Sequence, residues 1–195
     1  MLVKEIHLYD GDVFLQHNAF RSPGAASTEQ LDRLMKKVNY YSEIYSKMHK
    51  HVVPHADYVN SDNIDSFVNM SYVFICIDKS SARKNIMGGL LKLNIPFIDV
   101  GLGVNIVDDK LIGTLRVTNA NSDKNDHLSI RTPLEDDAVN EYATNIQIAD
   151  LNSFNACLAV IKWKKTCGFY QDLENEFHST YSINNSKLIN EDYTT

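Results

Sequence analysis

Three aspartates associated with apolar, strand-like runs are the first candidates for chemistry in this sequence. They are Asp10, after Leu2–Tyr9, Asp78, after Ser71–Ile77, and Asp99, within Pro96–Val100. Carboxylates accept hydrogen bonds from hydroxyl groups and coordinate hard cations such as Mg²⁺. Ligands of parallel α/β sheets bind at the carboxyl ends of the strands. We therefore expect these three carboxylates at the edge of the sheet where a ligand can bind.

Arg21 and Lys37 are the candidate cationic residues, and Asn18 lies on the same loop as Arg21. A planar guanidinium binds phosphate oxygens in two places, while a lysine acts as a point charge. The structural alternative is an ordinary surface. A lysine on a solvated helix is usually inert, and a strand-end aspartate such as Asp78 often only caps the next helix, a role that Ser80 can share.

The elements that must position these residues alternate between strands and helices. A capping box, Ser27 with Gln30, predicts the start of a long amphipathic helix from Thr28 to about Lys50. The polar stretch 119–145 predicts a flexible crossover loop. Strand, helix and strand in alternation predict parallel pairing through right-handed crossovers. The other predicted elements are a strand at Val52–Val59, helical turns at Asp62–Asn69, a helix at Ser80–Asn94, a turn at Gly101-Leu102-Gly103, a hairpin over Val104–Thr118 that turns at Asp108-Asp109, a helix from Ile146 to about Lys165, and a terminal hairpin over Thr180–Asn190.

Composition narrows the class of protein. The 195 residues are 44% hydrophobic, enough for one domain with a sizeable core. A net charge of −6 opposes nucleic-acid binding, which needs clustered Lys and Arg. The sequence shows no secretory signal and no stretch of about 18 apolar residues, so we expect no membrane partner. Three cysteines without CxxC spacing favour a reducing, cytoplasmic environment.

The cysteines and histidines offer weaker candidates. Cys76 lies in an apolar strand and Cys157 at helical spacing with apolar residues, so both are predicted to be core thiols. Cys167, near a helix end, is predicted to be the exposed cysteine. His51 and His55 are four residues apart, but the proline between them opposes a helical metal-binding pair.

The most informative stretch is Ile6-His7-Leu8-Tyr9-Asp10-Gly11-Asp12, followed by Asn18 and Arg21. It resembles the second strand and following loop of the ThiF, MoeB and ubiquitin-activating-enzyme family, with the same separations. The resemblance implies that Asp10 binds the ribose of ATP. It also implies that Asn18 and Arg21 contact the phosphates.

Two further segments carry the resemblance. Lys37-Val38 resembles the family's lysine that reaches the nucleotide phosphates, with the adjacent Lys36 as the alternative. Cys76-Ile77-Asp78, followed by Ala82-Arg83, resembles the strand end whose aspartate coordinates magnesium. The family commonly has Asn after this aspartate, whereas this chain has Lys79, which puts an amide contact there in doubt.

The resemblance covers nearly the whole chain, including Ile95-Pro96-Phe97-Ile98 and the predicted helix of Asn145–Asn152. It implies a Rossmann-like α/β fold, a mostly parallel sheet with helices on both faces and C-terminal antiparallel hairpins. The family's Gly-x-Gly-x-x-Gly loop belongs before Leu2, and neither Gly88-Gly89 nor Gly101-Leu102-Gly103 replaces it. We therefore expect a single, N-terminally truncated ThiF-like domain over residues 1–195, lacking the first β–α unit, with weak or absent ATP binding.

The function implied by the resemblance is ATP-dependent adenylation of the C-terminal carboxylate of a ubiquitin-like or sulfur-carrier protein. Arg21, Lys37 and Asp78 would be catalytic, Asp10 and Asn18 would help bind ATP, and Asp78 would hold Mg²⁺. A homodimer is expected because family members generally dimerise. The alternative is a non-catalytic module that dimerises or docks a modifier through the apolar helix from Ile146. A dehydrogenase is disfavoured, since the charged set suits phosphates rather than nicotinamide.

Overall fold

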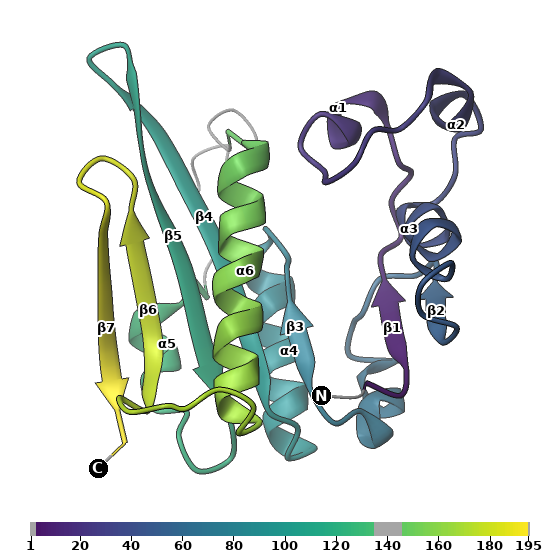
Figure 1. Ribbon diagram of the computed structural model, residues 1–195. Helices are drawn as coiled ribbons and strands as arrows, with labels where there is room; N and C mark the ends of the chain where they lie inside the picture. Colours follow the sequence, from purple (N-terminus) through teal and green to yellow (C-terminus); the bar gives the residue numbers. More distant parts are fainter. Residues whose placement is uncertain (1–2, 135–145, 195) are drawn as a thin grey trace. The chain divides into compact units, whose positions relative to one another are not determined.

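The computed structural model describes residues 3–134 and 146–194. The chain divides into two compact units, Met1–Val59 and Asn60–Thr195, which are considered one at a time (Figure 1). Among the described residues, no helix is both long and apolar enough to cross a bilayer. A single domain over residues 1–195 stays a prediction.

The first unit is built on a parallel pair of short strands. β1 (Ile6–Tyr9) pairs with β2 (Val52–His55), and α3 (Lys37–Tyr45) packs against both strands. Two short helices, α1 (Gln16–Ala19) and α2 (Thr28–Asp32), lie between β1 and α3 in the chain. The strand predicted from Leu2–Tyr9 is confirmed as β1 within the described residues, and the strand predicted at Val52–Val59 is shorter.

The long helix predicted from Thr28 to about Lys50 is wrong. The capping box at its start forms, but α2 ends at Asp32 and Leu34 adopts a left-handed φ of 46°. The next residues leave helical geometry to bridge the segment after β1. Phe14 N donates to Met35 O at 2.8 Å, and Lys37 N donates to Asp12 O at 2.9 Å. These bonds between distant segments replace helical ones, and they start α3 beside the end of β1.

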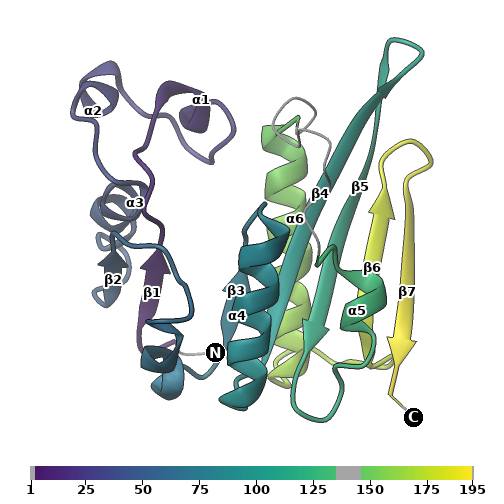
Figure 2. The same ribbon diagram turned by 180° about the vertical axis from the view of Figure 1, so that it is seen from behind.

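The second unit contains a five-stranded sheet in the order β3-β4-β5-β6-β7. β3 and β4 are parallel, and the other three pairings are antiparallel. α6 covers one face of the sheet and α4 lies on the other (Figures 1 and 2). The elements are η1 (Ile64–Asn69), β3 (Val73–Ile75), α4 (Ser80–Lys92), β4 (Phe97–Val107), β5 (Lys110–Ala120), α5 (Leu128–Arg131), α6 (Ala149–Thr166), β6 (Glu176–Ser182) and β7 (Lys187–Tyr193).

The predicted α/β class is confirmed, with parallel pairing in β1–β2 and β3–β4 and antiparallel strands toward the C-terminus. The predicted helices at Ser80–Asn94 and from Ile146 correspond to α4 and α6, and the terminal hairpin corresponds to β6–β7. The predicted crossover loop, 119–145, begins with the last residues of β5 and includes α5. Its residues 135–145 lie outside the described part of the chain.

The turn predicted at Gly101-Leu102-Gly103 is wrong, because β4 runs straight through it. Gly101 has a different purpose. A Cβ atom there would lie 2.7 Å from Nη2 of Arg116, its partner on β5, so the glycine lets the guanidinium fold across β4. The hairpin turn predicted at Asp108 and Asp109 is confirmed, and both residues have left-handed φ values, 49° and 58°.

Candidate functional site

Charged side chains gather at the carboxyl end of β1 in the first unit. Lys37 Nζ donates to Asp12 Oδ2 at 2.6 Å and lies 3.5 Å from Asp10 Oδ2. Asp10 Oδ1 accepts a hydrogen bond from Asp12 N at 2.7 Å, which closes the turn after the strand. The hydrogen bond from Lys37 is the main reason that the pKa of Asp12 is lowered. Lys37 therefore contacts both carboxylates at the strand end.

Lys36 and Lys37 have different partners. Lys36 sits in the bridge to Val13, and its Nζ donates to the carbonyl oxygen of Gly11 at 2.6 Å. Lys37 begins α3 and is the lysine that reaches Asp10 and Asp12. Its side chain is 20% exposed, so a ligand at this edge can reach it.

Tyr58 completes this strand-end cluster, which we define as Asp10, Asp12, Lys36, Lys37 and Tyr58. The Tyr58 hydroxyl donates to Asp12 Oδ1. The ring covers the residue between the two aspartates, where a Cβ atom on the glycine would lie 2.5 Å from the ring. Sequence reasoning treated Asp12 only as part of a turn, although its position two residues after Asp10 was a usable signal. No local signal pointed to Tyr58, which is 46 residues from Asp12.

Asn18 and Arg21 lie on the loop between β1 and α3. Asn18 is 6% exposed, and its Oδ1 accepts a hydrogen bond from Leu15 N at 2.9 Å, so it caps α1. Arg21 is half-buried, and its guanidinium has no hydrogen-bond or ion-pair partner among the residues that the structure describes. The structure thus brings Asp10 and Lys37 together, places Asn18 inside the loop and leaves the Arg21 charge available to a ligand.

Asp78 belongs to the second unit, in the connection between β3 and α4, where it is exposed. Asp78 is not the N-cap residue of α4: that position is Lys79, whose side chain makes no capping hydrogen bond. The Asp78 carboxylate forms no ion pair within residues 3–134 and 146–194, so its oxygens are available to a hard cation. Its predicted magnesium-binding role stays a prediction.

Asp99 is not an open ligand-binding carboxylate, contrary to expectation. It is completely buried, with Oδ1 3.0 Å from Arg83 Nε and Oδ2 2.5 Å from Arg116 Nη2. Arg83 also donates to the carbonyl oxygens of Ile77 and Pro133. Burial raises the pKa of Asp99, and the two guanidiniums oppose that shift. Asp99, Arg83 and Arg116 therefore form a buried group of ion pairs that stabilises the second unit.

The predictions for the cysteines need correction. Cys157 is exposed rather than a core thiol, because it lies on an outward position of α6. Cys76 follows the end of β3 and has exposed surface, but burial of its thiol still raises its pKa to about 11, so its sulfur is partly enclosed. Cys167 is exposed as predicted. His55 lies on β2 and its Nε2 is 2.9 Å from Nδ1 of His7. Within the described residues, no three His, Cys, Asp or Glu side chains form a potential metal site.

Comparison with known proteins identifies similar folds. No protein-family profile matches the chain, and no curated protein gives a significant match. The microcin C7 biosynthetic enzyme MccB in complex with N-formylated MccA is similar, with a TM-score of 0.68 and 16% identity over 96% of this chain and 57% of that one. E. coli MccB with ATP has a TM-score of 0.64 and 17% identity, over 96% and 56%. PaaA has 0.63 and 14%, over 95% and 63%.

These identities show a shared fold and nothing finer. The chain spans less than two thirds of the length of each of these three proteins. The α/β fold described above is therefore similar to the fold of MccB.

Proposed function

We propose that this chain contributes to ATP-dependent adenylation of a carboxylate at the end of a peptide or protein. The observation that carries the proposal is the strand-end cluster, in which Lys37 reaches both Asp10 and Asp12. MccB, a solved structure with a similar fold, has been crystallised with ATP and with N-formylated MccA. Together these support a nucleotide and a peptide as the two substrates.

In this proposal, the attacking carboxylate displaces pyrophosphate from the α-phosphate of ATP and forms an acyl-adenylate. Asp10 accepts hydrogen bonds from the ribose hydroxyls. Arg21 and Lys37 hold the phosphates and stabilise charge on the leaving pyrophosphate, while Asn18 shapes the loop and offers its amide nitrogen. Asp78 is the residue available for Mg²⁺, which would neutralise phosphate charge. Catalysis of this kind is mostly positioning and charge stabilisation.

The finer assignments also belong to this proposal. The peptide or protein substrate would be a ubiquitin-like or sulfur-carrier protein, the active form a homodimer, and the compartment the cytoplasm. Residues 1–195 would act as one ThiF-like adenylation domain. The support is the residue order Asp10, Asn18, Arg21, Lys37, Asp78, which matches the order of functional residues in the resembled family.

Titration of the chain with Mg-ATP, followed by calorimetry or by amide NMR shifts, tests the proposal. We expect weak but measurable binding that Lys37→Met abolishes. Lys47→Met is the matched control, because Lys47 is an exposed lysine beyond the end of the same helix. Equal ATP binding by wild type and Lys37→Met would refute the role of the strand-end cluster. Where ATP binding is found, pyrophosphate exchange measures whether the chain also catalyses adenylation.

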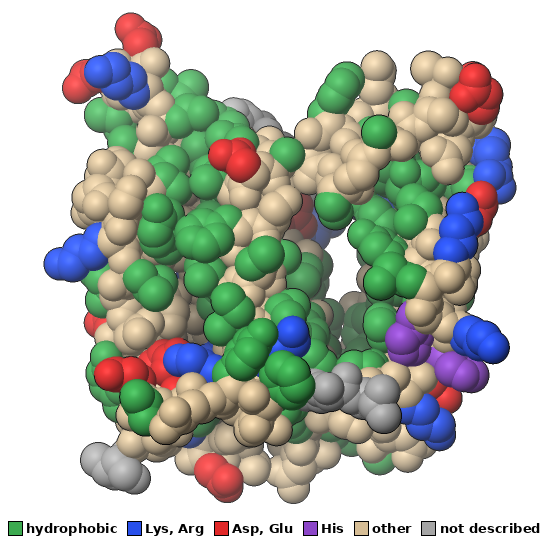
Figure 3. All heavy atoms as spheres, in the orientation of Figure 1, with side chains coloured by type: hydrophobic (Ala, Val, Ile, Leu, Met, Phe, Trp, Pro, Cys, Tyr) green, Lys and Arg blue, Asp and Glu red, His purple; other side chains and the backbone are tan. Residues whose placement is uncertain are grey.

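The second candidate is a non-catalytic dimerisation or modifier-docking module. It is favoured by exposed apolar side chains on α6: Phe154 is 40% exposed, Val160 39% and Ile161 45%. Figure 3 shows hydrophobic side chains spread over the face of the second unit on which α6 lies. Sedimentation analysis of wild type and Ile161→Lys tests whether this surface mediates self-association. The Mg-ATP titration separates the two candidates, because a docking module requires self-association or partner binding but no ATP.

A further inference from the structure

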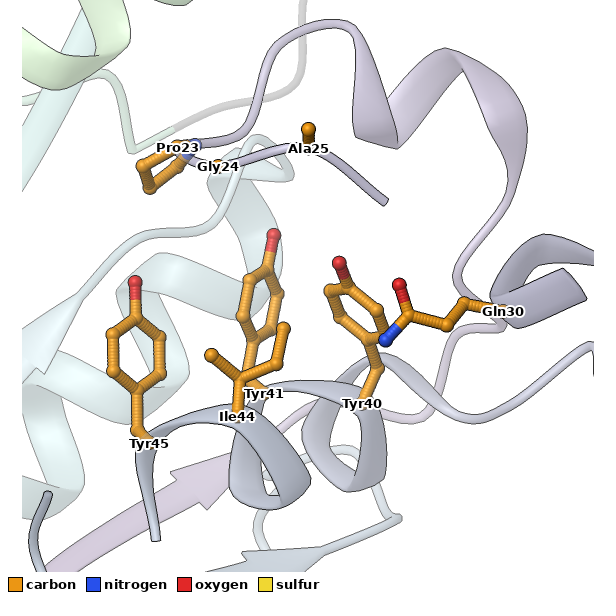
Figure 4. Close-up of a pocket in the computed structure, with 8 residues that line it drawn as sticks. All are labelled: Pro23, Gly24, Ala25, Gln30, Tyr40, Tyr41, Ile44 and Tyr45. Atoms are coloured by element: carbon orange, nitrogen blue, oxygen red, sulfur yellow. The ribbon is translucent and has the colours of Figure 1, made fainter. Parts of the chain in front are cut away.

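The first unit contains a pocket of ≈ 290 Å³ that none of the assigned roles uses (Figure 4). Its floor is α3, which contributes Tyr40, Tyr41, Ile44 and Tyr45, and residues 23–25 lie opposite. Figure 4 shows the three tyrosine rings rising side by side from α3, with their hydroxyl groups toward residues 23–25. The lining is therefore aromatic and aliphatic, with polar groups at one end.

The walls of this pocket are held in place by packing and hydrogen bonds. The ring of Tyr40 stacks on the buried ring of Phe14, with centroids 3.9 Å apart. Ser22 Oγ donates to Asn18 O at 2.6 Å and lies 2.6 Å from the Tyr41 hydroxyl. Because the Ser22 proton is used, Tyr41 is the donor in the second bond. The loop that carries Arg21 is thereby tied to α3.

Tyr40 differs from Tyr41 in having an unused hydroxyl. The residue is 5% exposed, and its hydroxyl has no hydrogen-bond partner within the described part of the chain. Burial raises the pKa of Tyr40, so the group stays a protonated donor. The hydroxyl oxygen is not among the enclosed polar atoms that lack a partner, so it is open to the pocket, and a ligand there that supplies an acceptor can receive its hydrogen bond.

We propose that this pocket binds one apolar side chain of the peptide or protein tail whose carboxylate is adenylated, with Tyr40 donating a hydrogen bond to a neighbouring backbone carbonyl. The inference rests on the proposed function. The volume is at the lower limit for small-molecule pockets and suits a single side chain such as leucine or phenylalanine. Aromatic walls provide apolar contact area for such a group.

The position of the pocket in the chain supports a peptide over other ligands. Tyr41 follows Lys37 by one turn on α3, and Ser22, which Tyr41 binds, is adjacent to Arg21. The elements that form the pocket are thus the same elements that carry the proposed phosphate-binding residues. A bound peptide segment would be held by the helix and loop that also hold the nucleotide.

The test uses the full chain labelled with ¹⁵N, without nucleotide, and two probes, acetyl-Gly-Leu-Gly-Gly and acetyl-Gly-Asp-Gly-Gly. We expect the leucine peptide to bind in the millimolar range and to shift the amides of Gly24, Ala25 and Gln30, and the aspartate peptide to bind more weakly. Tyr40→Phe, which keeps the ring, should weaken binding about fivefold, the effect of one ordinary hydrogen bond. Tyr170→Phe, an exposed tyrosine of the second unit, is the control and should change nothing.

Four results would each overturn the inference. They are equal binding of the two peptides, amide shifts confined to other residues, no peptide binding at all, and unchanged peptide affinity in Tyr40→Phe. Mg-ATP titration of the same samples keeps the two proposals distinguishable. Lost peptide selectivity with ATP binding that depends on Lys37 overturns the pocket alone. Peptide binding without any ATP binding overturns the proposed function, and with it the assignment of the peptide as acyl substrate.

Discussion

Replacing Asp99 by asparagine should strongly destabilise the second unit, because it removes the negative charge between two buried guanidiniums. Asp99 is completely buried, and the side chains of Arg83 and Arg116 are only 5% and 13% exposed. Removing one partner of a buried ion pair typically costs about 3–5 kcal/mol. Asparagine keeps the shape and one acceptor oxygen, so we expect a loss of about 3 kcal/mol, a large part of the roughly 5–15 kcal/mol that stabilises a typical domain.

Urea unfolding followed by circular dichroism measures this loss as a lower midpoint at unchanged slope. The double variant Asp99→Asn/Arg116→Met supplies the control, because it removes one of the two unbalanced positive charges. We expect the double variant to be more stable than the sum of the single changes predicts, by about 1 kcal/mol or more. A loss below about 1 kcal/mol in Asp99→Asn would mean that Asp99 is already neutral in the folded chain, and would refute the reasoning.

Three further predictions follow from single contacts. Burial lowers the pKa of His178 from 6.5 to about 4, so this histidine takes up a proton below pH 6.5 in the unfolded chain but stays neutral in the folded chain. Its contribution to the free energy of unfolding should be complete above pH 6.5 and fall by at most about 3 kcal/mol toward pH 4. In urea unfolding, the loss of stability between pH 7 and pH 5 should be smaller in His178→Asn. Gly101→Ala should destabilise the folded chain by about 1–3 kcal/mol, because the new Cβ atom would meet Arg116 Nη2. A thermal midpoint equal to wild type would contradict this. Gly103→Ala is the control, because the space around its Cβ position is open. Lys37→Met removes the hydrogen bond that mainly lowers the pKa of Asp12, so the carboxyl pKa measured by NMR titration should rise, and an unchanged value would show that Tyr58 alone sets it.

Local chemistry predicted local structure well. The capping box of Ser27 and Gln30 forms, and the Asp108-Asp109 turn adopts the left-handed backbone that aspartate tolerates better than most residues. Strands with continuous apolar character were also found, although their ends moved by several residues. In each case the responsible interactions lie within a few residues of one another, and the sequence displays them directly.

The errors arose where distant segments meet. The helix predicted through Leu34 breaks because Met35 and Lys37 bond to the segment after β1, some twenty residues earlier in the chain. The supposed glycine turn belongs to a strand because Arg116 on β5 needs the space above Gly101. Asp99 has the type and position of a ligand-binding residue, but two arginines distant in sequence enclose it. Periodicity and turn composition carry no information on such encounters.

Arg83 connects the buried interior of the second unit with a loop at its surface. One guanidinium binds the buried Asp99 and the carbonyl oxygen of Ile77, the residue just before Asp78. A cation that immobilises Asp78 would therefore also restrain Ile77 and, through Arg83, Asp99 on β4. Local unfolding of the sheet would become less frequent, and the amide protons of β4 would exchange with solvent more slowly. Thermodynamic linkage requires the reverse as well, so a change that loosens the interior of the sheet would weaken the binding of any cation at Asp78.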